Sequence, residues 1–477
     1  MISQWVKPVL RPLARMYWPR RVDLPLSTWR LTRTAGGVLA WDGVPLDTLL
    51  DRWGSPLHVV DATRLSQNAA EFLAVPEGAE KGCEIFYSFK TNPVPGVLHY
   101  LKSCGVGAEV ISAFELWLAL KLGFEPNSIV YDGPAKSPES LRVAVERGVG
   151  LINLNSRCEI APLAAICREV GRRARVGVRI VPIGAWGGQM GERVDSGAAL
   201  RAFTEALECP ELDVVALHAH RGGQMSSAEE VRSFVSGVLA FAGELGQRLS
   251  LDLEVLDFGG SLACPTTHHL DPKEALRNRR LTVDLVPRPP QATLSIRGAT
   301  TLIVSMAEAH YREAGRPRPR IFLEPGRAMT SNTQMLLTRV MNIHDASGGL
   351  RHAVLDAGFC VAGPVQTEYH QLFPVGPSRR GGKKQMYRLT GPICSPADIL
   401  YAAWELPELA VGDALAIMDS GAYFVPFASS FSFPQPGIAM VDGGQARLLR
   451  RGETFEDITA LDEMGDSAPD AVASKTH

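Results

Sequence analysis

The stretch Tyr87-Ser88-Phe89-Lys90-Thr91-Asn92-Pro93 decides the fold, because it places a lysine at the end of an apolar run and directly before a turn. The run Glu84–Phe89 is apolar and aromatic, which predicts a strand covered on both faces. Pro93 and Pro95 then open a helical pattern that continues to Leu101. A lysine at the carboxyl end of such a strand has a desolvated stem beside a pocket, which favours a lowered pKa and imine formation. The plain alternative is a lysine whose stem lies on the strand end and whose amine stays in water.

Further apolar runs come after it, and helical patterns separate them. The strand-like runs are Glu84–Lys90, Ala108–Ser112, Ile129–Gly133, Leu151–Ser156, Arg175–Pro182, Val214–His220, Leu253–Gly260 and Arg320–Arg327. The clearest helical patterns are Ala113–Gly123, Pro138–Arg147, Arg157–Arg172 and Ala228–Leu249. This alternation predicts an α/β fold with a (β/α)8 barrel.

Reactive side chains gather at the ends of these runs. They are Lys90, Glu109, Ser112, His218, His220, Asp257 with Gly259-Gly260, and Glu324 with Gly326-Arg327. Barrels of this kind carry their chemistry at the carboxyl ends of the strands. We therefore expect these residues to meet in one site at one end of the barrel.

After Arg327 the sequence pattern changes to short strand-like runs separated by turn residues. These runs are Gln334–Val340, His352–Asp356, Gln385–Thr390, Ala414–Met418, Gly437–Val441 and Ala446–Leu449, with a helix expected only at Ala397–Leu400. They predict an all-β sandwich or barrel domain over residues 331–454. The barrel is expected over 61–330, strands that join the β domain over 37–60, a basic N-terminal arm over 1–36 and a flexible tail over 455–477.

Composition excludes several classes of function. The 477 residues include 49 basic and 51 acidic ones, and a net charge of -2 does not suit a nucleic-acid-binding protein. The eight cysteines show no CxxC or Cys/His spacing, which predicts reduced thiols and no metal site. No apolar run approaches membrane-spanning length, so we expect a soluble, cytoplasmic protein. The basic arm is expected to pack on the body or on a partner subunit; membrane adsorption and docking of an acidic carrier protein are the alternatives.

The run endings suggest a common chemistry. The glycines of Phe258-Gly259-Gly260-Ser261 let backbone N–H groups approach an anion, and Gly326-Arg327 adds a guanidinium. Glu324 suits a ring nitrogen and His220 suits a ring face, although an ion pair with Arg327 and a core histidine are their plain alternatives. A lysine imine, a phosphate cradle, a carboxylate and a flat histidine together point to pyridoxal 5'-phosphate.

Six ordered motifs between Gly37 and Leu449 carry a resemblance to a known family. They are Tyr87-Ser88-Phe89-Lys90-Thr91-Asn92, His218-Ala219-His220-Arg221-Gly222-Gly223-Gln224, Asp257-Phe258-Gly259-Gly260, Glu324-Pro325-Gly326-Arg327, Gly391-Pro392-Ile393-Cys394 with Asp398, and Gly421-Ala422-Tyr423. In these motifs the chain resembles the fold type III pyridoxal phosphate-dependent decarboxylases, the ornithine/diaminopimelate decarboxylase family. The resemblance implies an alanine racemase-like barrel followed by a β domain.

The resemblance also implies roles for single residues. Lys90 would carry the cofactor as an aldimine, through which a quinonoid intermediate forms, His220 would stack on its ring, and Glu324 would pair with the pyridine nitrogen. The phosphate would be held by Gly259, Gly260, Gly326, Arg327 and Tyr423. Cys394 would protonate the carbanion in the neighbouring subunit's site, which implies a head-to-tail homodimer with shared active sites. Glu324 and Cys394 favour a decarboxylase over the related racemases, which place an arginine at the ring nitrogen.

The chain departs from the family pattern around the substrate. Gly223 stands where a serine is common, with Ser261 as a candidate substitute in the cradle, and Glu109 replaces an aspartate. Ser395 replaces the acidic residue that binds the distal ammonium of the substrate, and Gly363 replaces the arginine that binds a distal carboxylate.

These losses make free diaminopimelate, ornithine and lysine poor candidates. We expect a modified, conjugated or carrier-tethered amino acid, bound near Ser395 and Asp398, in amino-acid or secondary-metabolite metabolism. A partner-binding pseudoenzyme and a racemase are the alternatives.

Overall fold

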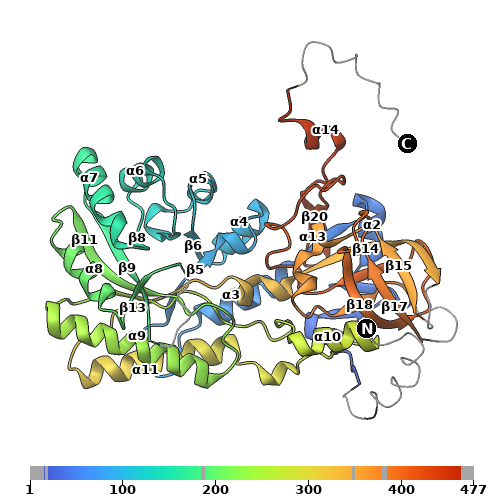
Figure 1. The fold of residues 1–477 in the computed structure, drawn as a ribbon, viewed down its shortest axis with the longest axis horizontal. Helices are drawn as coiled ribbons and strands as arrows, with labels where there is room; N and C mark the ends of the chain where they lie inside the picture. Colours follow the sequence, from blue (N-terminus) through green and yellow to red (C-terminus); the bar gives the residue numbers. More distant parts are fainter. Residues whose placement is uncertain (1–15, 17–19, 184–188, 346–349, 378–383, 464–477) are drawn as a thin grey trace.

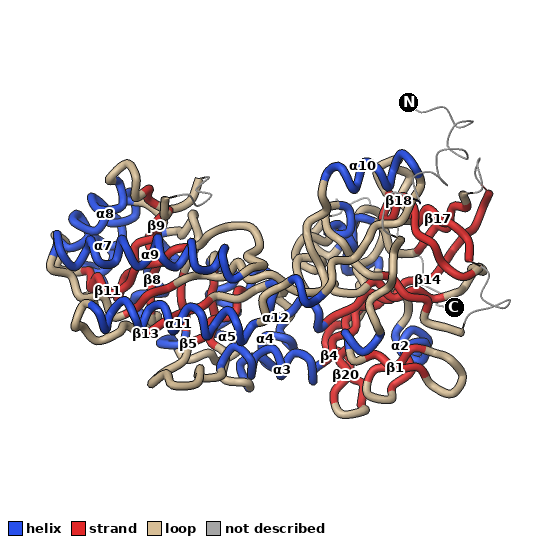
Figure 2. Tube along the Cα trace, turned by 90° about the horizontal axis from the view of Figure 1, so that it is seen from below, coloured by secondary structure: helices blue, strands red, loops and turns tan. Residues whose placement is uncertain are grey.

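The computed structural model describes residue 16 and residues 20–183, 189–345, 350–377 and 384–463. These residues form two lobes that lie side by side (Figure 1). One lobe is a barrel surrounded by helices, and the other is rich in strands and carries α10 (Pro272–Leu281) on its surface (Figures 1 and 2).

A closed barrel of parallel strands forms the first lobe. The strands are β5 (Cys83–Ser88), β6 (Gly107–Val110), β7 (Ile129–Tyr131), β8 (Leu151–Leu154), β9 (Ala174–Val181), β11 (Leu212–Ala219), β12 (Val255–Asp257) and β13 (Arg320–Leu323). Each pairs with the next in this order, and β13 pairs with β5 to close the ring. The short strand β10 (Glu192–Arg193) adds to β9. The predicted (β/α)8 barrel is confirmed.

Helices alternate with the barrel strands and cover them on the outside, and the first of these helices precedes β5. They are α3 (Ala62–Leu73), α4 (Pro95–Ser103), α5 (Ala113–Lys121), α6 (Pro138–Arg147), α7 (Ile160–Val170), α8 (Ala198–Leu207), α9 (Ala228–Leu249) and α11 (Ile296–Glu313). Their ends reflect local chemistry. Helix α9 begins with a capping box in which Ser227 and Glu230 satisfy each other's backbone N–H groups. Helix α6 starts at Pro138 and ends before Gly148, which has a φ of 71°.

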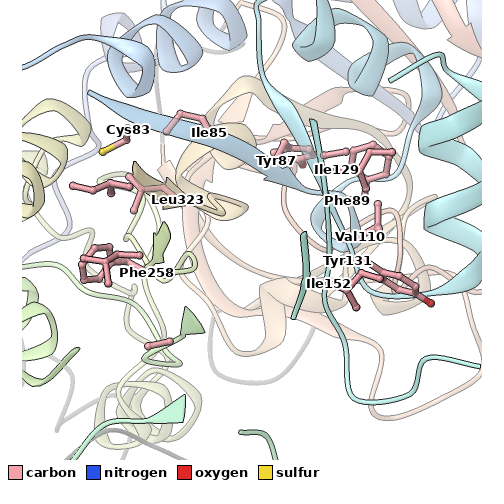
Figure 3. Packing of buried hydrophobic residues seen from close by; sticks show 14 of the residues in the cluster. Cys83, Ile85, Tyr87, Phe89, Val110, Ile129, Tyr131, Ile152, Phe258 and Leu323 are labelled. Carbon is pink, nitrogen blue, oxygen red and sulfur yellow. The ribbon is translucent and has the colours of Figure 1, made fainter. Parts of the chain in front are cut away.

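The barrel strands bury both faces, as the run Glu84–Phe89 predicted. Tyr87, Phe89, Tyr131 and Phe258 belong to the cluster between strands and helices and are at most 1% exposed (Figure 3). A second cluster inside the ring contains Phe86 and Phe322, whose centroids lie 4.5 Å apart. This apolar filling closes the middle of the ring, so the side chains that line the cavity of the site come from the strand ends and the loops after them.

The second lobe is built on the long strand β14 (Gln334–Asp345). Its sheet runs β18-β17-β15-β14-β4-β20-β21, and β19 with β16 branches from β14. The remaining bounds are β4 (Leu57–Asp61), β15 (Arg351–Leu355), β16 (Leu372–Pro374), β17 (Lys384–Thr390), β18 (Ile399–Pro407), β19 (Ala414–Ile417), β20 (Gly437–Asp442) and β21 (Gln445–Arg450). Strand β4 lies between β14 and β20, so a segment that precedes the barrel completes this sheet.

The helix predicted at Ala397–Leu400 is wrong. Asp398 is buried, and its carboxylate accepts hydrogen bonds from the backbone N–H groups of Phe359 at 2.8 Å and Ile393 at 3.2 Å. These bonds fold the segment into a turn, and β18 begins directly after it at Ile399. Local helix propensity loses here to a tertiary contact.

The chain ends also differ from the prediction. Strand β1 (Leu31–Arg33) pairs with β2 (Leu39–Trp41), so the predicted limit at residue 36 divides a hairpin. In the tail, α14 (Phe455–Thr459) forms behind a capping box of Thr454 and Asp457. Residues 1–15, 17–19 and 464–477 of the predicted arm and tail lie outside the described residues. Within the described ranges, no helix has the length and apolar character needed to cross a bilayer.

Candidate active site

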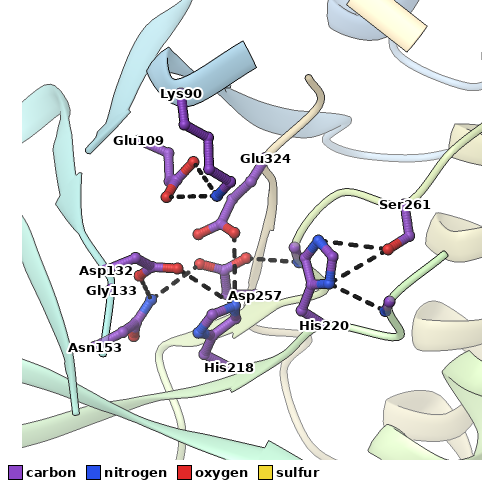
Figure 4. Close-up of polar contacts among 12 residues, drawn as sticks. Lys90, Glu109, Asp132, Gly133, Asn153, His218, His220, Asp257, Ser261 and Glu324 are labelled. Carbon is purple, nitrogen blue, oxygen red and sulfur yellow. Dashed lines mark hydrogen bonds and ion pairs between the residues drawn. The ribbon is translucent and has the colours of Figure 1, made fainter. Parts of the chain in front are cut away.

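Lys90 lies where β5 ends, in the single turn η2 (Phe89–Thr91) that comes directly after it. Its Nζ is 3.3 Å from both carboxylate oxygens of Glu109, which is fully buried at the end of β6 (Figure 4). The Lys90 side chain is 39% exposed. The amine therefore opens into a cavity and is held by one carboxylate.

The prediction of a lowered Lys90 pKa is wrong for this arrangement. Burial lowers the pKa of the ammonium, but the charge of Glu109, with smaller contributions from Tyr423, Glu324 and Asp132, outweighs it and raises the pKa. The carboxylates come from the ends of other strands, and the lysine's own sequence neighbourhood contains none of them.

Below Lys90, a buried acidic cluster surrounds His218 (Figure 4). The His218 Nε2 atom is 3.5 Å from Glu324 Oε2 and 3.6 Å from Asp132 Oδ2. Burial raises the pKa of Glu324 well above its usual value, and the charges of Asp132 and Glu109 add to this. Burial and the nearby Glu324 likewise raise the pKa of Asp257. The site therefore favours the protonated form of Glu324 more than water does, and its Oε1 has no hydrogen-bond partner within the described ranges.

Asp132 and Asn153 complete this cluster, and neither was singled out from the sequence. Asn153 Nδ2 donates to Asp132 Oδ1 at 2.7 Å and to Asp257 Oδ2 at 3.4 Å. Burial opposes ionisation of Asp132, but His218, Arg179 and this amide outweigh it and lower its pKa. The signal was available, because each is a polar residue in or at the end of an apolar run.

His220 lies beside the glycine turn at the end of β12. The Ser261 Oγ atom lies 3.3 Å from His220 Nδ1 and 3.4 Å from Nε2, and the Gly222 N–H donates to Nδ1 at 3.1 Å. Burial, Lys90 and Arg179 lower the pKa of His220 well below its usual value. The imidazole is therefore neutral, as a ring-stacking partner should be.

The glycines of the predicted cradle have no room for a side chain. Gly259 has a φ of 60°. A Cβ at Gly260 would lie 2.5 Å from the Glu324 carbonyl oxygen, and one at Gly326 would overlap the Thr91 hydroxyl. These positions therefore require glycine, and the loops they form lie against one another.

Arg327 does not pair with Glu324. Its Nη1 and Nη2 donate to the two oxygens of Glu368 at 2.7 Å each, and the two side chains are 11% and 6% exposed. Its guanidinium carbon lies 5.1 Å from the ring centroid of Tyr423. Glu368 was missed from the sequence, because it lies in the second lobe, 41 residues beyond Arg327.

These elements enclose a cavity of about 220 Å³. It is lined by Ser88, Lys90, Thr91, His220, Gly223, Gln224, Gly260, Ser261, Leu262, His269, Glu324, Gly326, Arg327 and Tyr423. Cys394, Ser395 and Asp398 do not line it. Cys394 is exposed, and the Ser395 Oγ accepts from the backbone N–H of Ala397 at 3.3 Å.

Pyridoxal phosphate fits this cavity on three observations. A partly exposed amine projects from Lys90, the buried carboxyl of Glu324 has an oxygen without a hydrogen-bond partner in the described part of the chain, and a neutral imidazole lies at His220. The glycine loops and the guanidinium of Arg327 suit an anion. A closed parallel barrel with a lysine among such groups at its strand ends is the architecture of a pyridoxal-dependent enzyme of the barrel class.

Comparison with known proteins assigns the family. Residues 68–331 match the family described as pyridoxal-dependent decarboxylase, pyridoxal binding domain, and the chain belongs to this family. The diaminopimelate decarboxylase of Methanothermobacter thermautotrophicus is 28% identical over 435 residues, which cover 88% of this chain and 95% of that protein. That of Actinosynnema pretiosum is 30% identical over 451 residues, covering 91% and 95%.

A solved structure shares the fold. The crystal structure of diaminopimelate decarboxylase from Methanocaldococcus jannaschii superposes with a TM-score of 0.81 at 23% identity, over 93% of this chain and 99% of that one. The predictions of family, two-domain fold, carboxy-lyase class and pyridoxal phosphate as cofactor are confirmed.

Proposed function

We propose that the chain removes the α-carboxylate of an amino-acid conjugate, with pyridoxal phosphate bound in the Lys90 cavity. The observation that carries the proposal is the position of Lys90 at the cavity wall, with the unpartnered Oε1 of buried Glu324 lining the same cavity. When bound, the cofactor supplies an electron sink for the bond to the departing carboxylate. The side chains of the cavity would hold it, orient it and carry protons beside it.

Glu324 and Glu109 would exchange protons with the cofactor ring nitrogen and the Lys90 amine, respectively. The unpartnered Oε1 of Glu324 would face a ring nitrogen, where the carboxyl group would share a proton with that nitrogen and, as the carboxylate, stabilise its positive charge. Glu109 lies within reach of Nζ and is the base that takes the proton which Lys90 must lose before it can act as a nucleophile.

His220, Tyr423 and the loops around Gly260 and Gly326 would orient the cofactor. The neutral imidazole of His220 packs on a ring face, and the loops approach the phosphate closely because they carry no side chain there. Arg327 adds positive charge: one N–H of each terminal nitrogen donates to Glu368, which leaves Nε and the second N–H of each terminal nitrogen as donors for the phosphate. The Ser261 hydroxyl lies within hydrogen-bond distance of the His220 ring, so it would mainly orient that ring and would contribute less to binding the phosphate.

Cys394 would act in a second copy of the chain. Its thiol is exposed and does not line the cavity of its own chain, which supports a homodimer with shared active sites. The buried carboxylate of Asp398 holds the segment that carries Cys394 and Ser395, so it would position this segment rather than contact substrate.

The substrate would lack the charged end of diaminopimelate, ornithine or lysine. Ser395 offers only a hydroxyl, which already accepts from its own loop. Gly363 has no side chain that could bind a distal carboxylate, and the space where a side chain would begin is open. A conjugated amino acid, free or tethered to a carrier protein, requires neither charge reader.

Carbon dioxide release tests the proposal. The holoenzyme is incubated with free diaminopimelate, ornithine and lysine and with neutral acyl conjugates of amino acids, beside Lys90→Ala and the surface control Lys384→Ala. We expect release only from conjugates, in the wild type and in Lys384→Ala. Rapid release from a free diamino acid would refute the substrate assignment, and loss of optical activity without carbon dioxide would indicate a racemase.

A further inference from the structure

A second cavity lies in the second lobe between helix α10 (Pro272–Leu281), the turn η8 (Gly363–Gln366) and strand β18. Its volume is about 560 Å³, more than twice that of the Lys90 cavity. Its walls are mixed, with polar groups beside the apolar side chains of Leu270, Leu276, Leu285, Val365, Ile399 and Leu400. Such walls suit the uncharged part of an extended ligand.

Only two charged side chains line this cavity, and both are arginines, Arg279 on α10 and Arg388 on β17. No ion pair links either to an acidic residue within the described ranges; Arg388 donates only to the Ala402 carbonyl, from Nε at 3.4 Å. Burial lowers the pKa of Arg388, and the nearby charge of Arg279 lowers it further. Two guanidinium groups that line one cavity without a carboxylate repel each other, and a bound anion would offset this repulsion.

Consecutive residues of one chain segment line the two cavities. His269 lines the Lys90 cavity and the next residue, Leu270, lines the second one. The backbone N–H of Leu270 donates to the Thr367 carbonyl at 2.9 Å, which fixes this crossing point on the second lobe. Pro396 and Ala397, which directly follow the Cys394 and Ser395 pair, form another part of the wall.

We propose that the cavity lined by Arg279 and Arg388 binds a phosphate group at the end of an extended, uncharged chain, and so anchors the distal end of the substrate. The inference rests on the proposed decarboxylation of a conjugated amino acid. It explains how a substrate could be recognised by a site that has lost the readers of a distal ammonium and a distal carboxylate, because recognition moves to a phosphate further along the chain. A phosphopantetheine arm, free or borne by a carrier protein, has this chemistry.

Binding to the holoenzyme, measured by isothermal titration calorimetry, tests the proposal without any turnover. The probes are pantetheine 4'-phosphate, its phosphate methyl ester and pantetheine without phosphate. The variants are Arg279→Ala and Arg388→Ala, with Arg280→Ala as a matched control, because Arg280 is the exposed neighbour of Arg279 on α10 and does not line the cavity.

We expect the phosphorylated probe to bind the wild type and Arg280→Ala alike, and to bind each of the other two variants roughly tenfold more weakly, as for a lost charged hydrogen bond. Tight binding of the methyl ester supports a carrier-borne arm, which is a phosphodiester, and binding of the monoester alone supports a free conjugate. Equal binding of pantetheine, an equal loss in Arg280→Ala, or no binding at all overturns the proposal. Because the readout is independent of carbon dioxide release, its failure is distinguishable from failure of the proposed decarboxylation.

Discussion

The substitution Glu368→Gln tests how the second lobe holds the arginine of the active site. Glu368 accepts two hydrogen bonds of 2.7 Å from Arg327, and His370 Nε2 lies 3.6 Å from its Oε2. Burial opposes ionisation of Glu368, but His370 and Arg327 outweigh it and lower its pKa from 4.5 to about 2. This difference corresponds to about 3 kcal/mol between the charged and neutral forms. Glutamine keeps the shape but not the charge, so we expect the free energy of unfolding at pH 7 to fall by about 3 kcal/mol.

The pH dependence has a definite sign. Because the folded pKa of Glu368 lies below the unfolded one, its stabilisation is fully present above pH 4.5 and is lost as the pH falls toward 2. The difference in stability between wild type and Glu368→Gln should therefore be constant from pH 7 to about 4.5 and shrink below that value.

Urea unfolding followed by tryptophan fluorescence measures this difference. The matched control is Glu244→Gln, which breaks an exposed i,i+4 pair with Arg248 of the same 2.7 Å length on α9. That pair should contribute about 0.3 to 0.5 kcal/mol. If Glu368→Gln costs no more than Glu244→Gln, or if its cost grows between pH 4.5 and 3, the assignment of Glu368 as the buried counter-ion of Arg327 is refuted.

Three further outcomes are expected. Gly260→Ala should lower cofactor retention, measured by absorbance after gel filtration, because its Cβ would lie 2.5 Å from a carbonyl oxygen. The control Gly315→Ala has open space around its Cβ and should retain cofactor normally, with a loss of only about 1 kcal/mol in the free energy of unfolding because of its φ of 62°. Phe258→Ala should destabilise the barrel by about 3 to 5 kcal/mol in the same urea assay, and a loss below 1 kcal/mol would show that the ring is not tightly packed. Cys394→Ala should lower carbon dioxide release but leave cofactor retention and urea midpoint unchanged, since the thiol is exposed; an unchanged rate would rule out its proposed role in a second copy.

The sequence by itself determined the barrel and the identity of several groups that line the Lys90 cavity. Runs such as Glu84–Phe89 are short enough to be strands and carry apolar residues at successive positions from Ile85 to Tyr87, which indicates burial on both faces. Parallel strands bring their carboxyl ends to one rim, so Lys90, His220 and Glu324 were expected to meet, and they line one cavity. The errors came where a distant partner overrides local preference, as when Asp398 binds two backbone N–H groups and turns an expected helix into a loop.

Only the tertiary structure decided the electrostatics and the pairing of the charged groups. The Lys90 pKa is raised rather than lowered because Glu109, 19 residues away in the sequence, lies 3.3 Å from Nζ. Arg327 pairs with Glu368 of the other lobe, and the second cavity exists only because α10 lies against β18. Coulomb interactions depend on distance through space, and sequence periodicity reports which side a residue faces but not which charge from another element will meet it.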